Sequence, residues 1–166
     1  MRHRLGVAFV VWVAMMGLDF VLNAALFAGM YQEGGAFMLA PAEAFRRIPL
    51  GYLAFLVLAA GVTELAWRLG VTATSDGIRL GVLSGLVLGV AWSLGLYSVS
   101  TASPQVVLAF AAIWFALLTA AGAVAGTGLG RSSLRGLAVG VVGIGVLGAF
   151  VVIALQSLGV VPTLKP

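Results

Sequence analysis

The sequence predicts an all-α integral membrane protein, a bundle of five transmembrane helices forming one domain over residues 1–166. Three observations support this prediction. The chain is 62% hydrophobic and only 8% charged, whereas a soluble domain carries about 25% charged residues. Its apolar residues form five stretches long enough to cross a bilayer. Almost every charged side chain falls between those stretches or at their ends.

Each expected span contains the roughly 20 mostly apolar residues that a helix needs to cross the hydrocarbon core. The spans lie at about residues 5–30, 50–69, 80–99, 106–129 and 136–158. The first shares a basic start with secretory signal peptides. Its apolar run is long, however, and no small-residue cleavage motif follows it, so we expect a retained helix.

The connections between the spans carry the residues of turns. Residues 72–77 are small and polar and end in glycine, which is typical of a loop. Pro104 suits the first turn of the fourth span, and residues 130–133 separate the last two spans. The longest connection is residues 31–48, expected outside the cytoplasm. Its residues 41–48 predict either a plain solvated turn or a short helix on the membrane surface, with Ala42, Phe45 and Ile48 as apolar contacts.

The basic residues predict an orientation with the N-terminus in the cytoplasm and the C-terminus outside. That orientation places six arginines inside and three basic residues outside, in agreement with the positive-inside rule. The inner six are Arg2, Arg4, Arg68, Arg79, Arg131 and Arg135, and the outer three are Arg46, Arg47 and Lys165. The basic residues form no patch or run, so we expect no nucleic-acid partner.

Glycines recur at helical spacing in the last three spans. Small residues allow the close backbone approach that replaces hydrophobic force between helices in lipid. We therefore expect contact faces, and a tight unit of the last three helices, whether the faces meet within one chain or between copies. The glycines concerned are Gly81, Gly85 and Gly89, then Gly122, Gly126 and Gly130, then Gly136 and Gly140.

Asp19 is an acidic residue deep in the first span, and Asn23 follows one turn later on the same face. An ionised carboxylate at that depth is unfavourable by about 2.5–3.5 kcal/mol, so it should face protein or water and have a partner, or be protonated. Counting about 1.5 Å per residue from the inner helix ends predicts which residues share its level. These are Ser93, Trp92, Trp114, Phe55 and Phe150.

Two interpretations of this level are open. In the first, Asp19, Asn23 and Ser93 form a structural hydrogen-bonded clamp between helices. In the second, Asp19 and Asn23 with Ser93, Trp92 and Trp114 bind a cation or an amphipathic ligand, or relay a proton.

The remaining polar residues give no catalytic or cofactor signature. Glu64 and Arg68 stand at i and i+4 and are expected to form a structural ion pair, with Arg68 extending to the interface. The sequence has no cysteine, and His3 is its one histidine, so we expect neither a metal site nor haem ligation. It also lacks hydrolase and phosphate-loop motifs. We therefore expect no enzyme and no cofactor.

Three segments together resemble a known group of sequences: Asp19-Phe-Val-Leu-Asn23, Met38-Leu-Ala-Pro-Ala-Glu-Ala-Phe-Arg-Arg47 and Gly77-Ile-Arg-Leu-Gly81. The chain is similar to small, functionally uncharacterised bacterial multi-pass membrane proteins over about residues 15–130. The resemblance implies a bacterial plasma membrane and a helical fold, and it implies no activity. The proline- and tryptophan-rich motifs of the five-helix tryptophan-rich sensory proteins are absent, so their ligand is not transferred.

Two functions follow as hypotheses. The first is a non-catalytic membrane subunit, either a homo-oligomer or an accessory chain of a larger complex, packed through its glycine faces. The second is a small permease, channel or ligand-binding protein that uses Asp19, Asn23 and the neighbouring aromatic residues.

Overall fold

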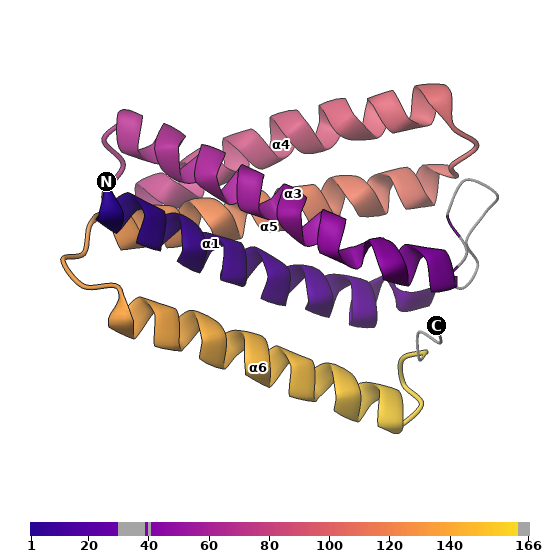
Figure 1. Ribbon diagram of the computed structural model, residues 1–166. Helices are drawn as coiled ribbons and strands as arrows, with labels where there is room; N and C mark the ends of the chain where they lie inside the picture. Colours follow the sequence, from indigo (N-terminus) through magenta and orange to yellow (C-terminus); the bar gives the residue numbers. More distant parts are fainter. Residues whose placement is uncertain (30–38, 40, 163–166) are drawn as a thin grey trace.

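The computed structural model describes residues 1–29, 39 and 41–162, and within that part the regular elements are all helical. The helices are α1 (Arg2–Val21), η1 (Leu22–Leu26), α3 (Pro41–Arg68), α4 (Thr74–Val99), α5 (Pro104–Leu129) and α6 (Arg135–Ser157), and η1 is a π-helix. The long helices run side by side, so that α1 begins and α6 ends at opposite ends of the molecule (Figure 1).

The five expected spans are confirmed as helices. Five segments are long and apolar enough to cross a membrane: Arg2–Leu26, Arg46–Arg68, Thr74–Val99, Pro104–Leu129 and Arg135–Ser157. Large apolar side chains such as Leu83, Ile144 and Phe150 are more than half exposed on the helix surfaces. In a bilayer these side chains contact lipid, which explains why so much apolar surface is not buried within the protein.

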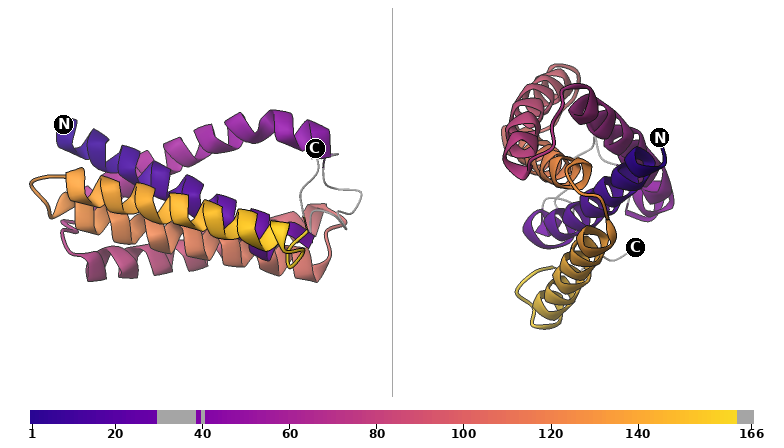
Figure 2. Two further views of the ribbon diagram at one scale, coloured as in Figure 1. Left: turned by 90° about the horizontal axis from the view of Figure 1, so that it is seen from below. Right: turned by 90° about the vertical axis from the view of Figure 1, so that its left-hand side faces the viewer.

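The second span begins earlier than expected. Residues 41–48 are helical, but they continue directly into α3 instead of forming a separate element. Pro49 lies inside this helix, where it has no N–H to donate to the carbonyl four residues earlier. The helix curves along its length (Figure 2, left). Pro104 begins α5 as expected, with the Ser103 hydroxyl accepting a hydrogen bond from the Val106 N–H across 3.4 Å.

Helix α1 lies at the centre of the packing, in contact with α3, α5 and α6. Its inward face presents Val7, Val11 and Met15, which are fully buried. They join buried residues of the neighbouring helices in one apolar cluster: Ala59 and Ala66 of α3, and Ile113, Leu117, Ala121 and Ala125 of α5. This cluster is the core of the bundle.

The closest pair of helices is α4 and α5, which touch through their backbones. A Cβ atom added at Gly77 would lie 2.1 Å from the carbonyl oxygen of Gly122, and one at Gly81 would lie 2.4 Å from that of Leu118. A Cβ atom added at Gly85 would lie 2.9 Å from the Cα atom of Phe115. Gly122, Gly126 and Gly130 approach the chain around α4 equally closely. Only glycine fits these positions without moving the helices apart.

The expected tight unit of the last three helices is not formed, because α6 packs mainly against α1. Seen along the bundle, α6 projects from the cluster of the other long helices (Figure 2, right). Gly145 faces Gly17, and Gly148 faces Val21, so α6 approaches α1 most closely there. Gly136 and Gly140 have nothing within 4 Å of an added Cβ, so the packing predicted for them is not made with any of the described residues.

Candidate functional site

Asp19 and Asn23 are hydrogen-bonded to each other near the end of α1. The side-chain amide Nδ2 of Asn23 donates to the Asp19 carboxylate Oδ1 across 2.8 Å and to the Asp19 backbone oxygen across 2.9 Å. Both side chains are half-buried. Across the α1–α3 contact, Tyr52 lies within electrostatic range of Asp19, and the Tyr52 backbone oxygen accepts a hydrogen bond from Trp12 Nε1. Asp19 therefore has its hydrogen-bond partner one turn later, in η1.

The helix widens into a π turn at this pair. The Phe27 N–H donates to the Leu22 carbonyl five residues earlier, across 2.9 Å. Such π turns change which backbone carbonyls find an intrahelical donor. Here the Ala24 backbone oxygen accepts a hydrogen bond from Gln156 Nε2 of α6, across 3.2 Å. The π turn was not predicted from the sequence, since Leu22-Asn-Ala-Ala-Leu26 contains neither proline nor glycine.

Ser93 does not join Asp19 and Asn23. It is buried on the face of α4 that also holds Gly81, Gly85 and Gly89, and that face packs on α5. Its hydroxyl has no hydrogen-bond partner among the described residues. The three-residue clamp expected from Asp19, Asn23 and Ser93 is therefore not formed. Counting along the helices could not give the direction of the Ser93 side chain.

The aromatic residues form a separate group on the α3–α5–α4 side of the bundle. Trp114 of α5 makes edge contacts with Phe55 of α3, at 6.4 Å between ring centroids, and with Trp92 of α4, at 6.5 Å. Trp92 is 60% exposed, and Phe150 of α6 is also exposed. Of the aromatic residues expected around Asp19, Phe55, Trp114 and Trp92 contact one another across neighbouring helices. Trp92 lies at the exposed edge of this group.

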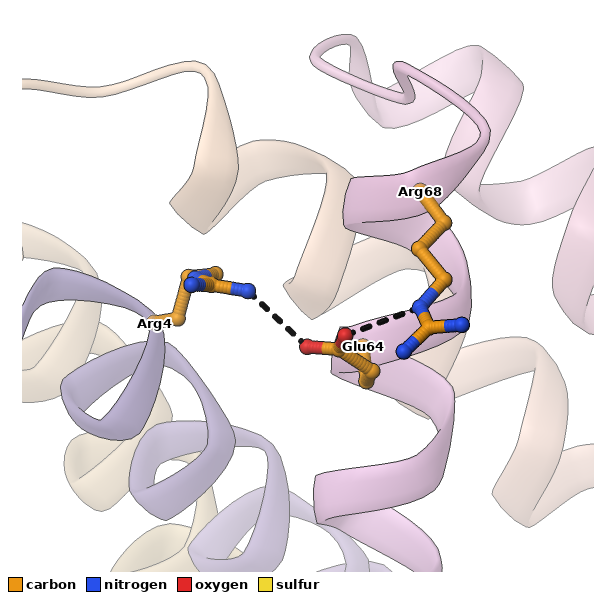
Figure 3. A network of polar contacts seen from close by, with 3 residues as sticks. All are labelled: Arg4, Glu64 and Arg68. Carbon is orange, nitrogen blue, oxygen red and sulfur yellow. Dashed lines mark hydrogen bonds and ion pairs between the residues drawn. The ribbon is translucent and has the colours of Figure 1, made fainter. Parts of the chain in front are cut away.

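The ion pair expected between Glu64 and Arg68 is present and belongs to a larger network. Arg68 Nε donates to Glu64 Oε1 across 2.9 Å, and Arg4 Nη1 of α1 donates to Glu64 Oε2 across 3.0 Å. Figure 3 shows the two arginines reaching the carboxylate from opposite sides. The Arg4 guanidinium also lies over the Trp67 ring, 3.7 Å from its centroid. Glu64 therefore connects α1 to α3.

A cavity of about 500 Å³ adjoins this network where α1 begins and α3 ends. Beside it, His3 Nε2 lies 3.1 Å from the Gly128 carbonyl oxygen of α5. The lining combines cationic, aromatic and apolar groups, including His3, Arg4, Trp67, Val71, Thr72 and Leu129. This cavity could not be predicted from local sequence patterns, because its lining comes from three separate segments.

The chain matches no protein-family profile, no curated protein and no solved structure. The resemblance to bacterial multi-pass proteins therefore gains no support from these comparisons, and the function has to be inferred from the residues of this chain.

Proposed function

We propose that this chain is a non-catalytic membrane subunit of the bacterial plasma membrane that assembles with other transmembrane helices, as a homo-oligomer or within a larger complex. In this proposal the N-terminus is cytoplasmic and the C-terminus external, as the distribution of arginines favours. The glycine-lined contact of α4 and α5 holds the chain together, and α6 supplies the surface for assembly.

The main support for the proposal is a face of α6 that contacts no other described helix. Val152 is the buried residue of this helix, which otherwise contacts α1 through Gly145 and Gly148. Gly136, Gly140 and Gly143 have nothing within 4 Å of an added Cβ. With 3.6 residues per turn, Gly136 lies on the side of the helix opposite Gly145. The free glycines therefore face away from the bundle.

A glycine face of this kind favours a second helix over lipid. Lipid tails are as apolar as leucine side chains, so helices associate in membranes through close packing and interhelical hydrogen bonds. On α6, Gly136 and Gly140 have the four-residue spacing of small-residue helix contacts, and Gly143 extends the same face. No other helix of the described chain lies against these three residues. The partner that fits them is a transmembrane helix of another chain.

The test is native mass spectrometry of the protein extracted from its own membrane in a mild detergent. We expect either a homo-oligomer or a stoichiometric complex with a second membrane protein. Exchange of Gly140 for leucine should abolish that assembly while leaving the monomer folded, because none of the described residues lies within 4 Å of an added Cβ at this position. The matched control is Val142→Leu on another exposed face of α6, which should assemble normally. A wild-type protein that is monomeric at its native abundance would refute the proposal.

A ligand-binding or transport role is the second candidate, and the π turn favours it. π turns occur frequently at functional sites, and here one contains Asn23 next to the intramembrane acid Asp19. Uptake or binding of an organic cation by proteoliposomes, lost in Asp19→Asn but kept in Glu43→Gln, would favour this role over assembly.

A further inference from the structure

One end of the bundle carries the excess positive charge of the chain. Six arginines lie at or beside the helix ends there, with Glu64 and Asp76 as the acidic residues of the same end. The cavity between the start of α1 and the end of α3 opens at this end. Met1, His3 and Arg4 are among its lining residues, and Arg4 shares Glu64 with Arg68. The hollow therefore offers an anion the Arg4 guanidinium at the arginine-rich end of the bundle.

We infer that this cavity binds the phosphate of an anionic phospholipid headgroup, with Arg4 as its principal ligand and Trp67 as the wall that orients Arg4. The inference does not depend on the assembly proposed above, since none of the lining residues belongs to α6.

Arg4 has donors to spare for a phosphate. A guanidinium group has five N–H donors in one plane, and a phosphate oxygen pair matches two of them. The hydrogen bond from Nη1 to Glu64 uses one donor. Trp67 covers one flat face of the group at 3.7 Å, which leaves the edge of the plane available. The Arg4 side chain is 31% exposed, so this edge can be reached from outside the protein.

The surroundings of the cavity fit a lipid better than a soluble phosphate compound. Val71 and Leu129 give it an apolar part. Leu5 and Leu69, which are 62% and 61% exposed, lie on α1 and just after α3 beside the lining residues. Trp67 is half exposed at the end of its span, where tryptophan rings lie at the level of the headgroups. A phospholipid can place its phosphate at Arg4 and its acyl chains along the leucines.

Glu64 provides a distinguishing test, because its carboxylate competes with the phosphate for Arg4. Its carboxylate holds both Arg4 and Arg68 in the absence of another anion (Figure 3). Removing the charge of Glu64 should release the Arg4 guanidinium and raise affinity for a phosphate. A purely structural role of the network predicts no such gain.

The experiment measures binding of dioleoyl phosphatidylglycerol to the full-length protein in detergent by native mass spectrometry, with dioleoyl phosphatidylcholine and inorganic phosphate as comparison probes. We expect phosphatidylglycerol to bind about tenfold more tightly to the wild type than to Arg4→Gln, the effect of losing one hydrogen bond to a charged group. The control is Arg79→Gln. It removes an equal charge from the same end, at a side chain that is 85% exposed and outside the cavity. We expect it to bind like the wild type.

Glu64→Gln gives a result that a folding defect cannot imitate. We expect it to bind phosphatidylglycerol more tightly than the wild type, by about threefold, since a neutral amide no longer opposes the phosphate charge. Weaker binding by Glu64→Gln, or equal losses in Arg4→Gln and Arg79→Gln, would overturn the inference. Equal binding of phosphatidylcholine, or displacement of the lipid by millimolar inorganic phosphate, would overturn the assignment to an anionic lipid.

Discussion

The side-chain amide of Gln156 donates a hydrogen bond to the backbone oxygen of Ala24 across 3.2 Å, so the last turns of α6 are attached to the π turn that follows α1. A backbone carbonyl inside a membrane needs a donor from the protein, because the hydrocarbon core supplies none. The irregular turn and the end of α6 therefore stabilise each other. The sequence separation of 132 residues makes this one of the longest-range contacts in the chain.

Replacing Gln156 with leucine should loosen the C-terminal part of α6. The Ala24 carbonyl loses this donor, a change of about 0.6–2 kcal/mol for an interhelical hydrogen bond in a membrane. We expect faster hydrogen–deuterium exchange in residues 22–29 and 150–157 than in the wild type. The control is Ser157→Ala, whose hydroxyl donates only to Ile153 of its own helix. Equal exchange in the two variants would contradict the proposed attachment.

The spans were predictable because each needs only a local property, a long apolar run between charged residues. The packing was harder to predict because it depends on which faces meet. Gly81 and Gly136 have the same four-residue spacing to a second glycine, yet only Gly81 touches another helix. Likewise the i,i+4 spacing predicted the Glu64–Arg68 pair. The Arg4–Glu64 ion pair depends on how α1 crosses α3, so no local sequence pattern predicts it.

The residues expected around Asp19 also show that spacing along one helix does not predict contacts between helices. The hydrogen bond between Asp19 and Asn23 followed from spacing along one helix. Whether Ser93 faced the pair depended on the rotation of α4, which its glycine stripe fixes against α5. That stripe was visible in the sequence, and adding Ser93 to it as the next position, four residues after Gly89, would have given the correct direction.

Gly81→Ala should destabilise the protein strongly. The new Cβ would lie 2.4 Å from the Leu118 carbonyl oxygen, so α4 and α5 must separate. Forcing extra carbon into a packed contact lowers the free energy of unfolding by about 1–3 kcal/mol. The measurement is unfolding in mixed micelles with increasing dodecyl sulfate. Gly136→Ala adds the same methyl group where nothing lies within 4 Å and should unfold like the wild type. Similar curves for both variants would show that the α4–α5 backbones are farther apart.

Asp19→Asn should leave stability within about 0.5 kcal/mol of the wild type, since the new side chain keeps an oxygen to accept from Asn23. Asp19→Leu removes that acceptor and should lower the free energy of unfolding by about 1 kcal/mol. The same micelle unfolding series measures both. If Asp19→Asn proved as unstable as Asp19→Leu, the negative charge itself would be required for stability, and a clamp in which the Asp19 carboxyl is already protonated would be ruled out.

The orientation of the chain is open to a direct test, because it contains no native cysteine and each introduced thiol is unique. Thr101 and Ser132 are exposed residues in connections at opposite ends of the bundle. The connection at Ser132 lies at the end with six arginines, which the positive-inside rule places in the cytoplasm. We expect a membrane-impermeant maleimide to label Thr101→Cys in intact spheroplasts and to label Ser132→Cys only after permeabilisation. The reverse pattern would place the arginine-rich end outside. The phosphate site at Arg4 would then face the outer leaflet, so the labelling result also decides which leaflet supplies the lipid proposed to bind there.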